Sequence, residues 1–214
     1  MEPPAIENTV SGQLSAGINM FFDISVKDTD ALHGFIGAQI PVIKESHGRG
    51  LPPGYSFSRK LYRAFSVDPT KYRPSSEALW RRINKGLEFP FVNPLVDLTN
   101  FLSLKYQVSY GLYDLAKING DIKITRGGDG DAYEGIRKDT ISLKGKIALK
   151  DASGAFGNPS SDSLRTCTSG DTVHVLQVIF FHPQDPGQED ILSATFHRYM
   201  EFFEVSGTRS YIIK

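Results

Sequence analysis

The sequence lacks the features that mark secreted, membrane-spanning or strongly charged proteins. Its 214 residues contain one cysteine, Cys167, which excludes an internal disulfide and is typical of a reducing compartment. No cationic stretch leads into an apolar run near residue 1, and no apolar run is long enough to span a bilayer. Basic and acidic residues number 24 each, so no overall charge excess points to nucleic acid or membrane. These absences predict a cytoplasmic, globular protein with no membrane partner.

Metal and thiol chemistry are also poorly supported. The five histidines show neither HExxH nor paired Cys/His spacing, so we expect no metal and no cofactor. The acidic run GGDGDAYEG at 127–135 lacks the ligand count and length of a calcium loop and predicts a hairpin turn instead. A lone thiol such as Cys167 is more often a small buried residue than a nucleophile.

Strand and helix patterns are present but follow no regular βαβ order. Apolar or alternating runs predict strands at 18–26, 120–126, 141–151, 173–181 and 209–213. Helices are predicted at 75–86, from Asn93 onward and at about 188–204, with Ser75 or Ser76 capping the first. Glycine and proline predict a loop at 47–57. This mixture favours an α+β fold, which we assign to one domain over residues 1–214, with mixed, mainly antiparallel sheets packed with helices.

Charge is unevenly distributed although its sum is zero. From Arg59 to Lys85 there are eight lysines or arginines against two acids, whereas 171–204 holds six acids and one base, Arg198. Such a split predicts that the basic segment contacts a polyanion. The alternative is that both segments are solvated helix faces. Arg73, Arg81, Arg82 and Lys85 are predicted to face outward.

The segment FVNPLVDLTNFLSL at 91–104 is apolar enough for a core helix, yet it carries a polar stripe. Asn93 before Pro94 predicts the helix start, because Asn accepts from freed N–H groups and Pro lacks a donor to leave unpaired. Asn93, Asp97 and Asn100 then recur at i, i+4 and i+7. Each would cost about 1–3 kcal/mol if buried without a partner. The stripe is therefore either a set of internal hydrogen bonds or a ligand site, and its spacing alone leaves both open.

The chain from Asn93 onward resembles a segment of bacterial phenylalanyl-tRNA synthetase beta subunits; it reads NPLVDLTNFLSLKYQVSYGLYDLAKINGDIKI. That segment reads roughly N-x-V-V-D-V-T-N-Y, then L-H-A-F-D, then D-K-I-x-G-x-I. KGKIALKDASGAFGNPSSDSLRTCTSGDTVHVLQVIF is similar to the second half of the same unit, the B3/B4 domain, so the resemblance spans about residues 70–182. It implies a free-standing B3/B4 domain, because no catalytic-subunit partner region or anticodon module is present.

The resemblance also implies a function. In that family the domain binds the misloaded aminoacyl end of tRNA and hydrolyses the wrong ester. It therefore implies the tRNA acceptor end as partner and an aminoacyl-tRNA deacylase acting in trans, not an enzyme that aminoacylates tRNA itself. Two alternatives stay open: a noncatalytic RNA-binding or regulatory module, and a small-molecule sensor or amidohydrolase-like enzyme that uses an amino-acid pocket. The oligomeric state stays open as well.

The polar groups of the family carry over only in part. The resemblance assigns Asp97 to the scaffold and Asn100 to a pocket. Its histidine falls on Gly111, its arginine falls near Pro90, and its glutamate after the glycine-rich turn has no clear equivalent. We therefore predict a replacement centre in GNPSSDSLRT, where Asp162 orients water or binds an α-ammonium, and Arg165 binds a carboxylate, a phosphate or an oxyanion.

Both side chains are predicted to converge on the cavity of Asn100, with backbone N–H groups around Gly154 and Gly157 forming an anion-binding concavity. The alternative is that Asp162 and Arg165 pair with each other and fasten a turn. The predicted pocket residues are Asn93, Asn100, Gly111, Tyr113, Gly157, Asn158 and Thr166. The predicted RNA contacts are Arg73, Arg81, Arg82 and Lys85.

Overall fold

The computed structural model describes residues 2–48, 50–137 and 139–214. The helices are α1 (Thr29–His47), α2 (Tyr55–Ala64), α3 (Ser75–Asn84), α4 (Pro94–Tyr106), α5 (Gln188–Phe202) and the short 3₁₀ helix η1 (Leu115–Lys117). The strands are β1 (Ile6–Asn8), β2 (Ser15–Phe22), β3 (Ser25–Val26), β4 (Ser109–Asp114), β5 (Ile122–Arg126), β6 (Ala132–Glu134), β7 (Thr140–Ser142), β8 (Ile147–Asp151), β9 (Gly154–Asn158), β10 (Ser161–Asp162), β11 (His174–Phe181), β12 (Phe203–Glu204) and β13 (Gly207–Ile213). The fold is α+β, as predicted.

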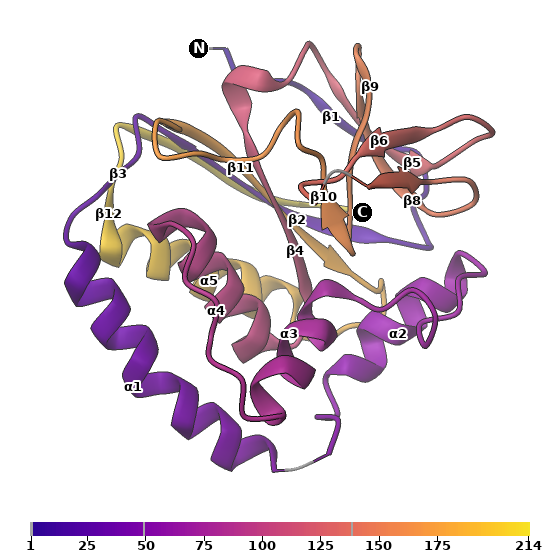
Figure 1. Ribbon diagram of the computed structural model, residues 1–214. Coiled ribbons are helices and arrows are strands. Elements are labelled where there is room, and N and C mark those ends of the chain that lie inside the picture. Colours follow the sequence, from indigo (N-terminus) through magenta and orange to yellow (C-terminus); the bar gives the residue numbers. More distant parts are fainter. Residues whose placement is uncertain (1, 49, 138) are drawn as a thin grey trace.

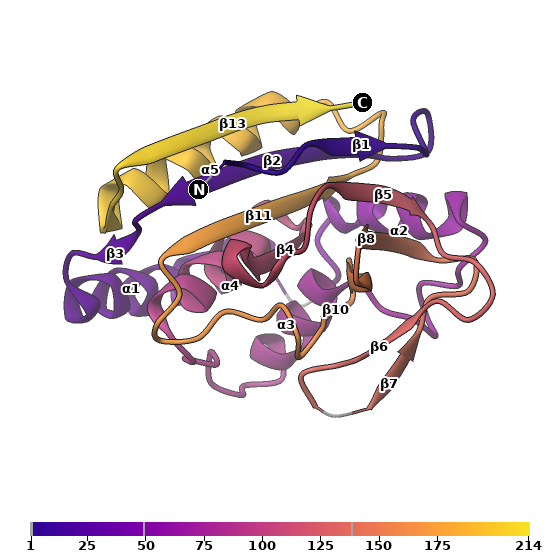
Figure 2. The ribbon, with the colours of Figure 1, turned by 90° about the horizontal axis from the view of Figure 1, so that it is seen from above.

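Three layers make up the architecture (Figures 1 and 2). A four-stranded antiparallel sheet, in the order β13-β2-β11-β4, forms the middle layer. Helices α1, α4 and α5 lie on one side of it, and a five-stranded sheet in the order β1-β5-β8-β9-β10 lies on the other. Only β1 and β5 pair in parallel within that second sheet. Two two-stranded sheets, β12-β3 and β6-β7, complete the description of the paired strands.

The middle sheet is apolar on both faces because a core lies on each side of it. Along β11, Val175 and Ile179 pack among the helices, whereas Leu176 and Val178 pack toward the five-stranded sheet. Side chains of a strand alternate between faces, so a sheet covered on both sides needs a nearly continuous apolar run. The sequence VHVLQVIFF meets that need, and the polar residue in its interior, Gln177, accepts a hydrogen bond from Asn19 across the sheet at 3.0 Å.

Several predicted boundaries are wrong for identifiable reasons. The predicted strand 18–26 breaks at Asp23, whose φ of 48° ends β2. The predicted strand 141–151 is two strands, since Gly145 turns the chain with a φ of 73° between β7 and β8. The predicted loop 47–57, in which position 49 lies outside the described residues, ends where α2 begins at Tyr55.

The start of α3 also differs from the prediction. Its N-cap position is Pro74, which makes no side-chain cap, so neither Ser75 nor Ser76 acts as the cap. The backbone N–H of Ser75 instead donates to Pro159 O at 3.1 Å, which joins α3 to the turn between β9 and β10. Within the described ranges, no helix is long and apolar enough to cross a membrane.

Candidate functional site

The polar residues Asn93, Asp97 and Asn100 of helix α4 and its N-cap have different surroundings. Asn93 caps the helix by accepting from the Val96 N–H at 3.0 Å, as predicted. Asp97 is fully buried, accepts from the Val92 N–H at 2.6 Å and lies 2.9 Å from His33 Nε2. Asn100, one turn further on, lines a cavity. The helix is therefore anchored at its start and offers one amide to a ligand.

That cavity, which we call the Asn100–Asp162 cavity, lies where α3, α4, β4 and β10 meet. Its volume is about 120 Å³. The lining residues are Ser75, Leu79, Thr99, Asn100, Ser103, Tyr110, Ser160, Ser161 and Asp162. Nearly all of them carry neutral hydrogen-bonding groups, and the carboxyl of Asp162 is the single acid. The amide of Asn100 makes no side-chain hydrogen bond to another described residue, so it is available to a ligand.

Asp162 is the chemically distinctive member of this cavity. It pairs with Gly157 across β10 and β9, and its Oδ2 accepts a long bond of 3.4 Å from the Leu112 N–H. Its Oδ1 is buried and has no hydrogen-bond partner within the described part of the chain. Burial raises the pKa of Asp162 to about 7, although the Tyr113 hydroxyl and the Leu112 N–H act in the opposite direction. Such a carboxyl is poised to exchange a proton near neutral pH.

Tyr113 forms the layer behind Asp162. Its ring lies over two glycines, because a β-carbon at either Gly111 or Gly157 would come within 2.2 Å of its hydroxyl oxygen. The ring meets Phe156 edge-on, with 5.0 Å between the centroids. The predicted pocket residues Gly111, Tyr113 and Gly157 are not among the residues that line this cavity, and they pack together behind it instead.

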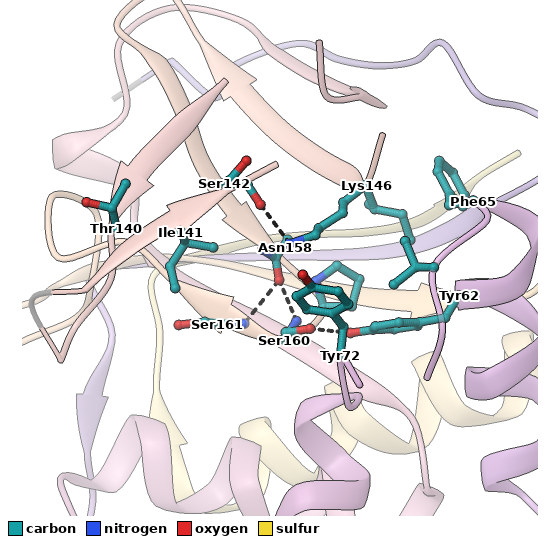
Figure 3. A pocket seen from close by; sticks show the side chains of 13 residues that line it. Tyr62, Phe65, Tyr72, Thr140, Ile141, Ser142, Lys146, Asn158, Ser160 and Ser161 are labelled. Carbon is teal, nitrogen blue, oxygen red and sulfur yellow. Dashed lines mark hydrogen bonds between the residues drawn. The ribbon is translucent and has the colours of Figure 1, made fainter. Parts of the chain in front are cut away.

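A second cavity of about 290 Å³ lies beside the first, and we call it the Tyr62–Lys146 cavity (Figure 3). Ser160 and Ser161 line both cavities and so form a shared wall. The turn is rigid there, because Asn158 Oδ1 accepts from the N–H groups of both serines, at 2.6 and 3.1 Å. Asn158, a predicted pocket residue, thus lines the second cavity and holds the wall.

Arg165 does not converge on this site, and that prediction is wrong. Its guanidinium binds both carboxylate oxygens of Asp151 at 2.9 Å and donates to Lys117 O at 3.1 Å. The alternative, an Asp162–Arg165 pair, is equally absent, since Asp162 is held at Leu112. A guanidinium binds a carboxylate well through two parallel N–H groups. The carboxylate that the fold places beside Arg165 is that of Asp151, at the end of β8.

Other predicted groups also lie elsewhere. Asn93 lines a separate cavity with Ser169 and Thr172. Thr166 is buried, and its carbonyl accepts from the Asp114 N–H at 2.9 Å. Gly154 and Gly157 lie within the paired strand β9, so the predicted concavity of backbone donors is not formed there.

The basic segment surrounds one buried acid. Glu77 is fully buried on α3, accepts from Arg59 at 2.8 Å and from Arg81 at 2.9 Å, and lies 3.7 Å from Arg73. Three guanidiniums on one carboxylate leave an excess of positive charge beside the cavity. Arg82 and Lys85 are exposed at the far end of the helix.

Some lining residues escaped the sequence analysis. Thr99, Ser103 and Tyr110 line the first cavity. On helix α4, Ser103 lies three residues after Asn100 and four after Thr99, a spacing that could have marked a shared surface. No cluster of three or more His, Cys, Asp or Glu side chains that could hold a metal occurs in residues 2–48, 50–137 and 139–214.

Comparison with known proteins places the chain in a family. A family model, the B3/4 domain, matches residues 58–200. The structure is similar to that of an N-terminal fragment of the phenylalanyl-tRNA synthetase beta-subunit from Pyrococcus horikoshii, with 13% sequence identity and a TM-score of 0.46. The match covers 99% of this chain and 50% of that one, so the chain spans about half the length of that fragment. No curated protein matches the sequence. Because the family model covers more than half of the 214 residues, the chain belongs to the B3/4 domain family.

Proposed function

We propose that this protein binds the acceptor end of a tRNA and hydrolyses the ester bond of misacylated aminoacyl-tRNA in trans, in the Asn100–Asp162 cavity. The observation that carries the proposal is Asp162. Asp162 is half-buried, its Oδ1 is buried without a hydrogen-bond partner among the described residues, and burial raises its pKa to about 7. It lies in the wall of a cavity lined by hydroxyls and an amide.

Hydrolysis of this ester makes modest demands on the protein. The ester is already activated, so it needs a positioned water and stabilisation of the developing oxyanion. Asp162 takes the proton as the oxygen of that water bonds to the ester carbonyl carbon. The bond from that carbon to the ribose oxygen then breaks, and the ribose oxygen takes up the proton. The products are a free amino acid and an uncharged tRNA, with no other reactant.

Neutral donors supply the remaining interactions. With Arg165 held at Asp151, the amide of Asn100 and the hydroxyls of Ser160 and Ser161 are the groups available to the carbonyl oxygen and the α-ammonium. Each can donate without adding a charge that the small cavity would have to desolvate.

The basic segment adjoins this cavity through α3. Ser75 and Leu79 from that helix line the wall, and the Ser75 N–H holds the β9–β10 turn. A polyanion bound along the arginines of α3 therefore has its end near Asp162. Phosphate contacts of this kind position a nucleic acid without reading its sequence.

The test is a deacylation screen over a panel of mischarged tRNAs, with catalyst-free controls and an Asp162→Asn variant. Loss of the general base should lower turnover by on the order of 10²- to 10⁴-fold. Asp129→Asn is the matched control, because Asp129 is an exposed acid paired with Lys144. No acceleration by the wild-type protein on any tRNA, with tRNA binding intact, would establish a noncatalytic RNA-binding module. Saturable binding of free amino acids without RNA would establish a small-molecule binding protein.

A further inference from the structure

The Tyr62–Lys146 cavity has no task in the hydrolysis described above, although it is the larger of the two adjoining cavities (Figure 3). One wall comes from α2 and the chain that follows it, through Tyr62, Phe65 and Tyr72. The opposite wall comes from β7, β8 and the turn between them, through Ile141 and Lys146. Aromatic surface therefore faces the cavity from one side and aliphatic surface from the other, and Lys146 is the one cation among the described lining residues.

Aromatic and basic residues alternate along the first of these walls. Tyr62, Phe65 and Tyr72 line the cavity, whereas Arg63, Lys71 and Arg73 are their exposed neighbours in sequence. Over residues 59–73 there are five basic residues and one acid, Asp68. Aromatic faces within a basic surface are the combination by which proteins bind single-stranded nucleic acid, since bases stack on the rings and the cations follow the phosphates.

Tyr72 and Lys146 are placed to act together at the mouth of the cavity. Tyr72 is 49% exposed, and Lys146 Nζ lies 4.0 Å from the centroid of its ring. The ammonium donates one hydrogen bond to Ser142 O at 2.8 Å, which leaves two of its three donors for a ligand. Deeper in the cavity, Phe65 is held from behind by Arg126, whose guanidinium carbon lies 4.7 Å from the ring centroid. One aromatic ring is thus accessible and another is fixed.

We propose that the Tyr62–Lys146 cavity binds the terminal nucleobase of a single-stranded RNA end, stacked on Tyr72, with Lys146 bound to the adjacent phosphate. The assignment to RNA rests on the proposed function, whereas the stacking chemistry rests on the cavity itself. Charge complementarity favours a nucleotide over an uncharged aminoacyl side chain, because Lys146 in the lining and the exposed Arg63, Lys71 and Arg73 nearby in sequence would contribute nothing to an apolar group.

The shared wall gives this assignment a geometric consequence. Ser160 and Ser161 separate the two cavities, and the Tyr62 hydroxyl hydrogen-bonds Ser160 Oγ at 2.6 Å. A terminal nucleotide with its base on one side of this wall directs its ribose toward the other side. The ester on that ribose would then reach the Asn100–Asp162 cavity, so base binding would position the bond that is hydrolysed.

The test uses a CCA trinucleotide, the sequence at tRNA acceptor ends, titrated into the full chain while tyrosine NMR resonances are followed. Tyr72→Ala should weaken trinucleotide binding by on the order of 10-fold, the scale of one lost stacking contact, whereas Tyr72→Phe should retain it. Tyr211→Ala is the matched control, because Tyr211 is an exposed tyrosine on β13 outside the cavity. Lys146→Ala should weaken binding as well, whereas Lys144→Ala, an exposed lysine in the same turn, should not.

The outcomes separate this inference from the proposed function. Trinucleotide binding that depends on Tyr72, without any deacylation, supports the nucleobase site and refutes the hydrolase. If a Tyr72→Ala variant deacylates tRNA with an unchanged KM, the nucleobase site is refuted and the proposed hydrolase function is supported. The inference is also refuted if no tyrosine resonance shifts at millimolar trinucleotide, or if a free aromatic amino acid amide occupies this cavity instead.

Discussion

The hydroxyl of Tyr113 lies so close over Gly111, two residues earlier on β4, that a β-carbon at Gly111 would come within 2.2 Å of it. The two residues face the same side of the strand, and the ring cannot withdraw because it is fully buried against Phe156. Glycine at 111 and tyrosine at 113 are therefore one packing solution, and the tyrosine hydroxyl acts on the carboxyl of Asp162.

Replacing Gly111 by alanine should therefore destabilise the protein by about 1–3 kcal/mol, the usual cost of overpacking a core. Urea denaturation measures the change. Tyr113→Leu in the same chain removes the contact and should recover most of the loss in a double-mutant cycle. The control is Gly34→Ala, since nothing lies within 4 Å of a β-carbon at that position of α1 and helical alanine is favoured over glycine. Equal losses at 111 and 34 would contradict the packing account.

Asp162 should give the stability of the protein a distinct pH dependence. Its folded pKa of about 7 lies above the ordinary value, so the folded state holds a proton that the unfolded state releases above about pH 4. Stability from this group is complete below the unfolded pKa and is lost as pH rises toward 7. Asp162→Asn removes this dependence. The free energy of unfolding of the variant minus that of the wild type should therefore rise between pH 4 and 7 and stay constant above pH 7.

Urea titrations at half-unit pH steps measure that difference, which reaches a few kcal/mol for a shift of this size. Tyr113→Phe provides a second check. The Tyr113 hydroxyl lowers the pKa of Asp162, so its removal should move the levelling point to higher pH. A constant difference between Asp162→Asn and wild type across the whole range would show that the carboxyl titrates normally.

The fold was predictable where one residue pattern decides the local structure. The start of α4 was correct because Asn93 and Pro94 act through their own backbone neighbours. Strand β11 was correct because a sheet with a core on both faces needs a continuous apolar run. Helix α1 was not predicted, since its 19 residues include Gly34, Gly37 and Pro41 and its core contacts are few. Packing of Leu32, Ile36 and Ile43 against the other helices decides that segment, and its local start signal, the Asp28 side chain that accepts from the Ala31 N–H, was missed.

The site was predictable only in part, for a related reason. Asp162 and Asn100 were placed in one cavity from their motifs, and the structure brings them together. Arg165 was misplaced because its partner, Asp151, precedes the same turn and becomes its neighbour only through the pairing of β8 with β9. Charge complementarity in sequence does not identify which carboxylate a guanidinium reaches. The Tyr62–Lys146 cavity was not predicted, because its walls come from segments about 75 residues apart.

Asp97 and Asn100 should separate stability from ligand binding. Asp97→Ala leaves the Val92 N–H and His33 without their acceptor, so it should cost about 1–3 kcal/mol and lower the melting temperature. Asn100→Ala removes an amide that faces the cavity, so it should leave the melting temperature nearly unchanged and weaken binding of aminoacyl-tRNA. Differential scanning calorimetry and filter binding give the two readouts. The assignment is reversed if Asn100→Ala is the more destabilising change.

Arg165→Ala should affect stability and spare catalysis. Burial raises the pKa of Asp151, but the guanidinium of Arg165 and the Asn119 N–H bring it below its ordinary value. Loss of that pair should cost about 1–3 kcal/mol at neutral pH, and the loss should shrink in acid as Asp151 takes up a proton. Turnover on a mischarged tRNA, measured where the variant is folded, should be nearly unchanged. A large fall in kcat would show that Arg165 takes part in catalysis.

Charge reversal on α3 should weaken tRNA binding only where the side chain is free to meet phosphate. Arg81 is bound to the buried Glu77, so Arg81→Glu would place two carboxylates together and test folding instead. Arg82 donates from Nε to Glu88 O at 3.0 Å and is otherwise exposed, and Lys85 is exposed beyond it. Arg82→Glu and Lys85→Glu should each lower the slope of log binding constant against log salt by roughly one unit. Arg209→Glu, an exposed arginine on β13, is the control, and an equal change there would show that the effect is one of net charge and not of an α3 surface.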